Sequence, residues 1–161
     1  MSKSGSFGVN YTKTFTTADD GLPAVVGDLG SSKYGDFIFV QADGAIDQYA
    51  AVKISDDGQA AMLTTTNAGS NNLQVGIAQV AAADDEYLWV WVGGVAGGGV
   101  GSGIKVKAAA SYAADANLQT TATAGVVDDA STTLIKNVVG LTTLTGAGTV
   151  EVKSTGHLSV N

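Results

Sequence analysis

The sequence predicts an all-β protein: a small β-sandwich or β-barrel of short antiparallel strands, preceded by an extended N-terminal arm. Three observations support this fold class. Short apolar runs recur between turn residues, alanine, glycine, valine and threonine dominate the composition, and the 161 residues include 22 glycines but one proline. A chain of this length is sufficient for one domain with its own hydrophobic core.

The first 33 residues differ from the rest of the chain. They are polar and rich in serine, threonine and glycine, with separated aromatic residues at Phe7, Tyr11 and Phe15. This spacing fits neither a helical stripe nor strand alternation. The segment is either a partly disordered tail or an extended arm that orders against a partner through its aromatic side chains. We therefore divide the chain into an arm, residues 1–33, and a β-rich domain, residues 34–161.

Short strands and turns follow in order from residue 34. The strands expected in the first half are residues 37–40, 49–54, 59–64, 73–81 and 87–92. Asp57-Gly58, between two of these runs, predicts a β-hairpin.

The strands expected in the second half are residues 104–108, 134–144, 149–152 and 158–160. Residues 109–118 fit a short helix or a loop, and residues 126–129 fit a turn. No exact internal repeat is found, which argues against a solenoid or a propeller.

The stretch EYLWVWVGGVAGGGVGSG, residues 86–103, joins an apolar run to a glycine-rich loop at residues 93–103. A membrane-spanning helix is disfavoured because the apolar run alternates as a strand, and because each glycine weakens a helix by roughly 1 kcal/mol. A phosphate-binding loop is disfavoured because Ile104 stands where a Walker motif needs lysine, and the Rossmann glycine spacing fails at every register.

Packing is the remaining explanation for this stretch. Trp89 and Trp91 share one face of the expected strand, and Leu88, Val90 and Val92 share the other. A strand that is apolar on both faces is usually buried on both. One face can fill the domain core, while the other needs cover from a second sheet, the arm or a neighbouring subunit. The two tryptophans are expected either in the core alone or in the core and at a subunit contact.

The charge balance limits the class of partner. The net charge is −7 and all eight basic residues are lysines, so the bidentate contacts of arginine are missing and a nucleic-acid partner is not expected. Charged residues make up 14% of the chain, which suits a β protein embedded in an assembly. There is no cysteine, and no secretory signal is visible.

Few residues are suited to catalysis or metal binding. His157 is the single histidine, expected at an exposed strand edge, and no GxSxG elbow is present. Aspartate pairs at residues 19–20, 56–57, 84–85 and 128–129 are interpreted as turn residues, with calcium binding as the alternative. A hydrolase using paired carboxylates would need a cleft that nothing in the sequence marks. We expect no enzyme activity, metal, cofactor or small-molecule substrate.

Several phrases of the domain have a familiar order. They are FVQADGA at residues 39–45, VGIAQV at 75–80, the strand with Trp89, VKAAA at 106–110, and LQTTATAGVVDDA at 118–130. This order resembles the capsid decoration, or cement, proteins of tailed bacteriophages. The resemblance covers residues 37–152 and excludes the arm and the glycine-rich loop.

The resemblance implies a homotrimer that is made in the host cytoplasm and binds the major capsid protein on the outer surface of the virion. Such a protein cements neighbouring capsomers against internal DNA pressure. Phe7, Tyr11 and Phe15 are then candidate anchors of the arm, and Trp89 and Trp91 are candidates for a capsid or subunit contact. No nucleic-acid or membrane partner is implied. The alternative is another virion structural protein, such as a fibre, tail or spike domain involved in host attachment.

Overall fold

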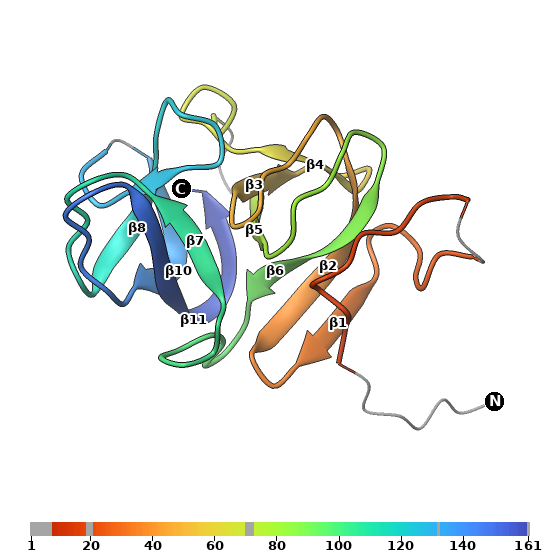
Figure 1. The fold of residues 1–161 in the computed structure, drawn as a ribbon, viewed down its shortest axis with the longest axis horizontal. Helices are drawn as coiled ribbons and strands as arrows, with labels where there is room; N and C mark the ends of the chain where they lie inside the picture. The colour runs from red at the N-terminus through yellow and green to blue at the C-terminus, as the bar shows by residue number, and fades with distance from the viewer. Residues whose placement is uncertain (1–7, 19–20, 70–72, 132, 161) are drawn as a thin grey trace.

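The computed structural model describes residues 8–18, 21–69, 73–131 and 133–160. Every helix or strand in these residues is a β-strand, which confirms the all-β fold class. The strands are β1 (Leu29–Ser32), β2 (Gly35–Ala42), β3 (Ala51–Ile54), β4 (Gln59–Met62), β5 (Gln74–Ala78), β6 (Tyr87–Gly93), β7 (Lys105–Ala108), β8 (Ala116–Thr120), β9 (Val127–Asp128), β10 (Leu134–Gly140) and β11 (Gly148–Val160) (Figure 1).

The strands close into two rings of five. In the first ring, β2 pairs with β4, β4 with β3, β3 with β5, β5 with β6, and β6 returns to β2. In the second ring, β7 pairs with β9, β9 with β8, β8 with β10, β10 with β11, and β11 returns to β7. The two rings lie next to each other, the second on the left of Figure 1. Strand β1 adds to the first half of β2.

The two rings have the same topology and the same register. The pair Gln41↔Tyr87 of the first ring recurs as Lys107↔Thr149, and Ala78↔Val90 recurs as Gly140↔Val152. Positions in β2 and β3 therefore recur 66 residues further along the chain, as from 41 to 107, and positions in β5 and β6 recur 62 residues further, as from 78 to 140. In both rings the first and third strands are parallel, which corrects the expectation of antiparallel strands throughout.

This duplication corrects the conclusion that the chain has no internal repeat. Between residues 38–54 and their equivalents, residues 104–120, only four positions are identical. They are Ile38, Val40, Ala42 and Ala50, which recur as Ile104, Val106, Ala108 and Ala116. The backbone is better preserved than the side chains: Tyr49 and its equivalent Asp115 both have left-handed φ, at 63° and 58°. The fold repeats where the sequence does not.

Three element boundaries differ from the sequence predictions. Residues 149–152 and 158–160 belong to one long strand, β11, because its polar middle section continues the ladder with β10. Residues 127–128, expected in a turn, form β9. Residues 109–115 are irregular and β8 follows, so the short helix considered for residues 109–118 is absent. The hairpin at Asp57-Gly58 is confirmed by the antiparallel pairing of β3 with β4.

A buried amide joins the two rings. Gln79, 4% exposed, donates from Nε2 to the carbonyl oxygen of Lys105 at 2.9 Å and accepts from the Lys105 N–H at Oε1 at 3.0 Å. Phe39, the first-ring equivalent of Lys105, makes the same two bonds with the main chain of Gly27 and Asp28. A first-ring side chain therefore satisfies β7 as a neighbouring main chain satisfies β2.

Two hydrophobic clusters follow from this arrangement. The interior of the first ring contains one cluster, which includes Val40, Val52, Leu88 and Val90. The larger cluster joins the interior of the second ring to the outward face of the first, where Trp91 lies. Strand β6 contributes to both clusters, because its alternate side chains point to opposite faces.

Candidate functional site

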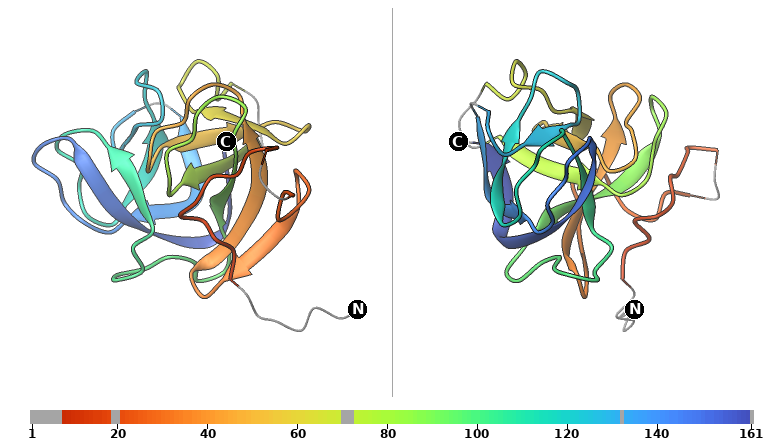
Figure 2. Two further views of the ribbon diagram at one scale, coloured as in Figure 1. Left: turned by 45° about the vertical axis from the view of Figure 1, so that its right-hand side comes forward. Right: turned by 60° about the vertical axis from the view of Figure 1, so that its left-hand side comes forward.

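The N-terminal arm folds back onto its own chain. Residues 8–18 run along the first ring, on the side away from the second ring (Figure 2). Tyr11 stacks on Phe37 with ring centroids 4.8 Å apart, and Phe15 exchanges two backbone hydrogen bonds of 2.8 Å with Tyr87. Phe7 lies outside the described residues. Tyr11 and Phe15 therefore contact the chain itself, and their contact with a capsid subunit stays a prediction.

The two tryptophans lie on the outward face of the first ring. Trp89 pairs with Phe39 and Trp91 with Phe37 in the ladder between β6 and β2, and the indoles are 7% and 0% exposed. Their cluster also includes Tyr11 and residues of the second ring. Both faces of β6 are therefore buried, as the sequence predicted, and the arm and the second ring supply the cover. A capsid or subunit contact at Trp89 and Trp91 stays a prediction.

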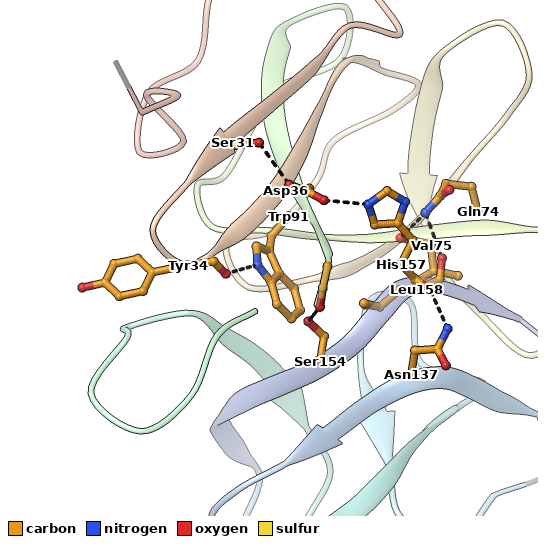
Figure 3. A network of polar contacts seen from close by, with 11 residues as sticks. Ser31, Tyr34, Asp36, Gln74, Val75, Trp91, Asn137, Ser154, His157 and Leu158 are labelled. Atoms are coloured by element: carbon orange, nitrogen blue, oxygen red, sulfur yellow. Dashed lines mark hydrogen bonds and ion pairs between the residues drawn. The ribbon is translucent and has the colours of Figure 1, made fainter. Parts of the chain in front are cut away.

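Polar contacts fix β11 and the glycine-rich loop against the first ring (Figure 3). The Trp91 indole Nε1 donates to the carbonyl oxygen of Tyr34 at 2.8 Å, and the Ser154 hydroxyl donates to the carbonyl oxygen of Gly94 at 2.8 Å. The Gln74 side-chain amide donates to the carbonyl oxygen of Leu158 at 2.8 Å. The C-terminal half of β11 is thus tied to both β5 and β6.

The same region contains His157, which is exposed on β11 as the sequence predicted. Its Nε2 lies 2.8 Å from Oδ2 of Asp36, and the other carboxylate oxygen of Asp36 accepts from the Ser31 hydroxyl at 3.0 Å. The carboxylate therefore lies between the imidazole and the hydroxyl. In a Ser-His-Asp triad the imidazole lies between them, so this arrangement does not activate Ser31 as a nucleophile.

The aspartate pairs within the described residues bond to main-chain and side-chain groups of loops. The Asp57 carboxylate accepts from the Ser55 hydroxyl, which lowers the pKa of that carboxyl. Asp84 accepts from the Gly44 N–H at 2.7 Å, and Asp129 accepts from the Ala113 N–H at 2.7 Å. These contacts agree with the interpretation of the pairs as turn residues. The pair at residues 19–20 lies outside the described residues.

The glycine-rich loop is held in one conformation by hydrogen bonds along its length. Gly98 donates its N–H to Tyr34 and Gly99 donates to Val152, each at 2.8 Å from the accepting carbonyl oxygen. The Glu151 carboxylate accepts from the N–H groups of Gly101 and Gly103, each at 3.2 Å. Left-handed φ at several of these glycines, 109° at Gly99 for example, explains why the segment excludes larger residues.

Two apolar side chains of this loop face solvent. Val95 is 89% exposed and Val100 is 87% exposed, the largest exposed fractions among the large hydrophobic residues of the described chain. Isolated exposed apolar residues are common on protein surfaces. Here they occur on a loop whose backbone is fixed at both ends and in the middle, which is the arrangement expected of a pre-organised contact surface. The sequence analysis missed both residues, although valines set among glycines were the available signal.

Neither a metal cluster nor a membrane helix is found in the part of the chain that the structure describes. No group of three or more histidine, aspartate or glutamate side chains in that part is placed to hold a metal ion. Likewise, none of its residues form a helix that is long and apolar enough to cross a bilayer.

Comparisons with family models, curated proteins and solved structures gave no match to this chain.

Proposed function

We propose that this chain is a non-enzymatic virion structural protein that binds the outer surface of an assembled phage capsid and cements neighbouring capsomers. The resemblance of residues 37–152 to capsid decoration proteins supports this function. The structural observation that carries it is the glycine-rich loop, residues 93–103, which holds Val95 and Val100 in solvent on a hydrogen-bonded backbone.

Such a loop suits binding to a rigid protein surface. Because its backbone is already fixed, binding costs little loop entropy. Full burial of a valine side chain contributes about 1.5–3 kcal/mol, so two valines supply a useful part of a contact energy. A protein that binds only the assembled capsid stabilises that state by mass action, and the effect accumulates over many copies.

The proposed partner is the major capsid protein, and the proposed assembly is a homotrimer on the virion surface. A closed symmetric trimer would present three identical loops to a threefold or quasi-threefold site of the shell.

Co-sedimentation with matching capsids tests this function. The wild-type chain should pellet with the capsids, and the double variant Val95→Ser/Val100→Ser should remain in the supernatant. Val25→Ser/Leu29→Ser is the matched control, because these exposed side chains, 72% and 65%, lie outside the loop. Failure of the wild type to pellet would reject the capsid role, and equal loss in both double variants would reject the loop as the contact.

A further inference from the structure

The two rings present opposite chemistry at equivalent outward positions. On the first ring these positions hold Phe39, Trp89 and Trp91. Their equivalents on the second ring are Lys105, Glu151 and Lys153, because 39 becomes 105, 89 becomes 151 and 91 becomes 153 under the offsets of 66 and 62. An aromatic face has therefore been replaced by a charged one on the same backbone.

On the first ring this outward face binds an extended segment. Residues 8–18 lie across it, and Phe15 pairs with Tyr87 through two backbone hydrogen bonds of 2.8 Å. Tyr87 can accept this pairing because its N–H and carbonyl point away from β2. Its partner Gln41 likewise directs its own N–H away from β6, to the carbonyl of Gly58. An antiparallel pair of this kind leaves one edge of the strand open.

The equivalent position on the second ring is Thr149, opposite Lys107. Lys107 also directs its N–H away, to the carbonyl of Tyr49 at 2.8 Å, so Thr149 faces outward as Tyr87 does. Within residues 8–18, 21–69, 73–131 and 133–160, no backbone hydrogen bond from another segment reaches the outward side of Thr149. An open groove of about 300 Å³ lies at this point, lined by Lys107, Ala108, Val126, Ala147, Gly148 and Thr149.

The charge of the second ring identifies what this groove would bind. Residues 35–93 carry eight acidic side chains and one lysine, a net charge of −7, whereas residues 103–160 carry four acidic side chains and four lysines. Lys105 and Lys153 lie on the outward face beside Glu151, but the Glu151 carboxylate is held by the N–H groups of Gly101 and Gly103. Lys107, on the same face, forms an ion pair of 2.8 Å with Asp47.

We propose that the outward face of β7 and β11 binds an extended acidic segment of a partner protein. The segment adds to the open edge at Thr149, as Phe15 adds to Tyr87, and its carboxylates contact Lys105 and Lys153. Main-chain pairing supplies the affinity and the lysines select the acidic sequence. The site is defined by the duplication and by charge, and it does not depend on the proposed capsid role.

Fluorescence anisotropy with two labelled peptides tests this site in the full chain. A peptide of alternating glutamate and valine should bind, with affinity that falls as salt rises, and a peptide of alternating lysine and valine should not. Lys105→Ala/Lys153→Ala should weaken binding by about tenfold, since an exposed ion pair contributes up to about 1 kcal/mol. Lys53→Ala, which removes a first-ring lysine, is the matched control and should bind as the wild type does. Equal binding of both peptides, or no binding of either, would overturn the proposal.

Two further variants separate a binding defect from a folding defect. Thr149→Pro removes the outward N–H, which a strand edge tolerates, and should abolish peptide binding while the melting temperature stays close to wild type. Lys105→Glu/Lys153→Glu should reverse the preference and bind the lysine peptide. Unchanged binding by Thr149→Pro would overturn the strand pairing. Self-association of the wild type that is lost in Lys105→Ala/Lys153→Ala would also overturn the proposal, by showing that a second copy fills the site.

Discussion

The first and second rings share one backbone plan but differ in how their outward faces are covered. Trp91 and Lys153 occupy equivalent positions, yet the indole is fully buried and the lysine is exposed. The reason is local: the arm and the second ring cover the first ring's outward face, and no described segment lies in the same way across β7 and β11. The inward positions changed much less, since Val40 and Val106 are the same residue. Closure of a ring therefore constrains the interior, while the exterior follows what each ring contacts.

Where the interiors differ, one change compensates for another. Ile46 and Ala78 of the first ring correspond to Tyr112 and Gly140 of the second. A Cβ atom added at Gly140 would lie 2.7 Å from the Tyr112 ring, so the larger aromatic side chain requires glycine opposite it. The Tyr112 hydroxyl donates to the Ala116 carbonyl at 2.6 Å and accepts from the Gly140 N–H at 3.2 Å. Packing density is thus kept by exchanging volume between neighbours.

The largest difference between the rings is expected at Trp91. Trp91→Ala should lower the free energy of unfolding by about 3–5 kcal/mol, because it removes a buried aromatic ring and leaves a cavity. Lys153→Ala, at the equivalent position, should change it by less than about 0.5 kcal/mol. Urea denaturation followed by circular dichroism measures both. Similar losses in the two variants would contradict the difference in cover.

The contact between the rings should show a smaller effect. Gln79→Ala leaves the buried N–H and carbonyl of Lys105 without partners, which should cost about 2–3 kcal/mol. Gln59→Ala, on exposed β4, is the control and should be near neutral. The same denaturation measurement applies, and a neutral Gln79→Ala would show that water replaces the amide at this contact.

The interior of the second ring should respond to alkaline pH through Tyr112. Burial raises the pKa of Tyr112 from 10.0 to about 12, so the folded chain keeps a proton that the unfolded chain loses earlier. This contribution is fully present below about pH 10 and is lost as pH rises to about 12, by at most about 1.4 kcal/mol per pH unit. Tyr112→Phe should be less stable at neutral pH by about 1 kcal/mol and should lose stability less steeply over this range. A parallel decline in both proteins, measured by denaturation at successive pH values, would assign the effect to other groups.

Sequence patterns predicted what depends on neighbouring residues and missed what depends on distant ones. The alternation at residues 87–92 identified β6 and the burial of both its faces, and Asp57-Gly58 identified a hairpin. Strand β11 was divided in two because Lys153, Thr155 and His157 are exposed and interrupt the apolar pattern. The duplication was missed because outward residues such as Trp91 and Lys153 follow their surroundings. The return of the arm onto the first ring depends on pairing of Phe15 with Tyr87, which no local pattern encodes.

Amide hydrogen exchange at Tyr87 and Thr149 tests the central claim most directly, since these equivalent groups differ in cover. Exchange at Tyr87 should be slow, because its N–H donates to Phe15, and exchange at Thr149 should be fast. Addition of the glutamate-valine peptide should slow exchange at Thr149 and leave Tyr87 unchanged. Equal protection of the two amides in the free chain would contradict the account of one filled and one open edge.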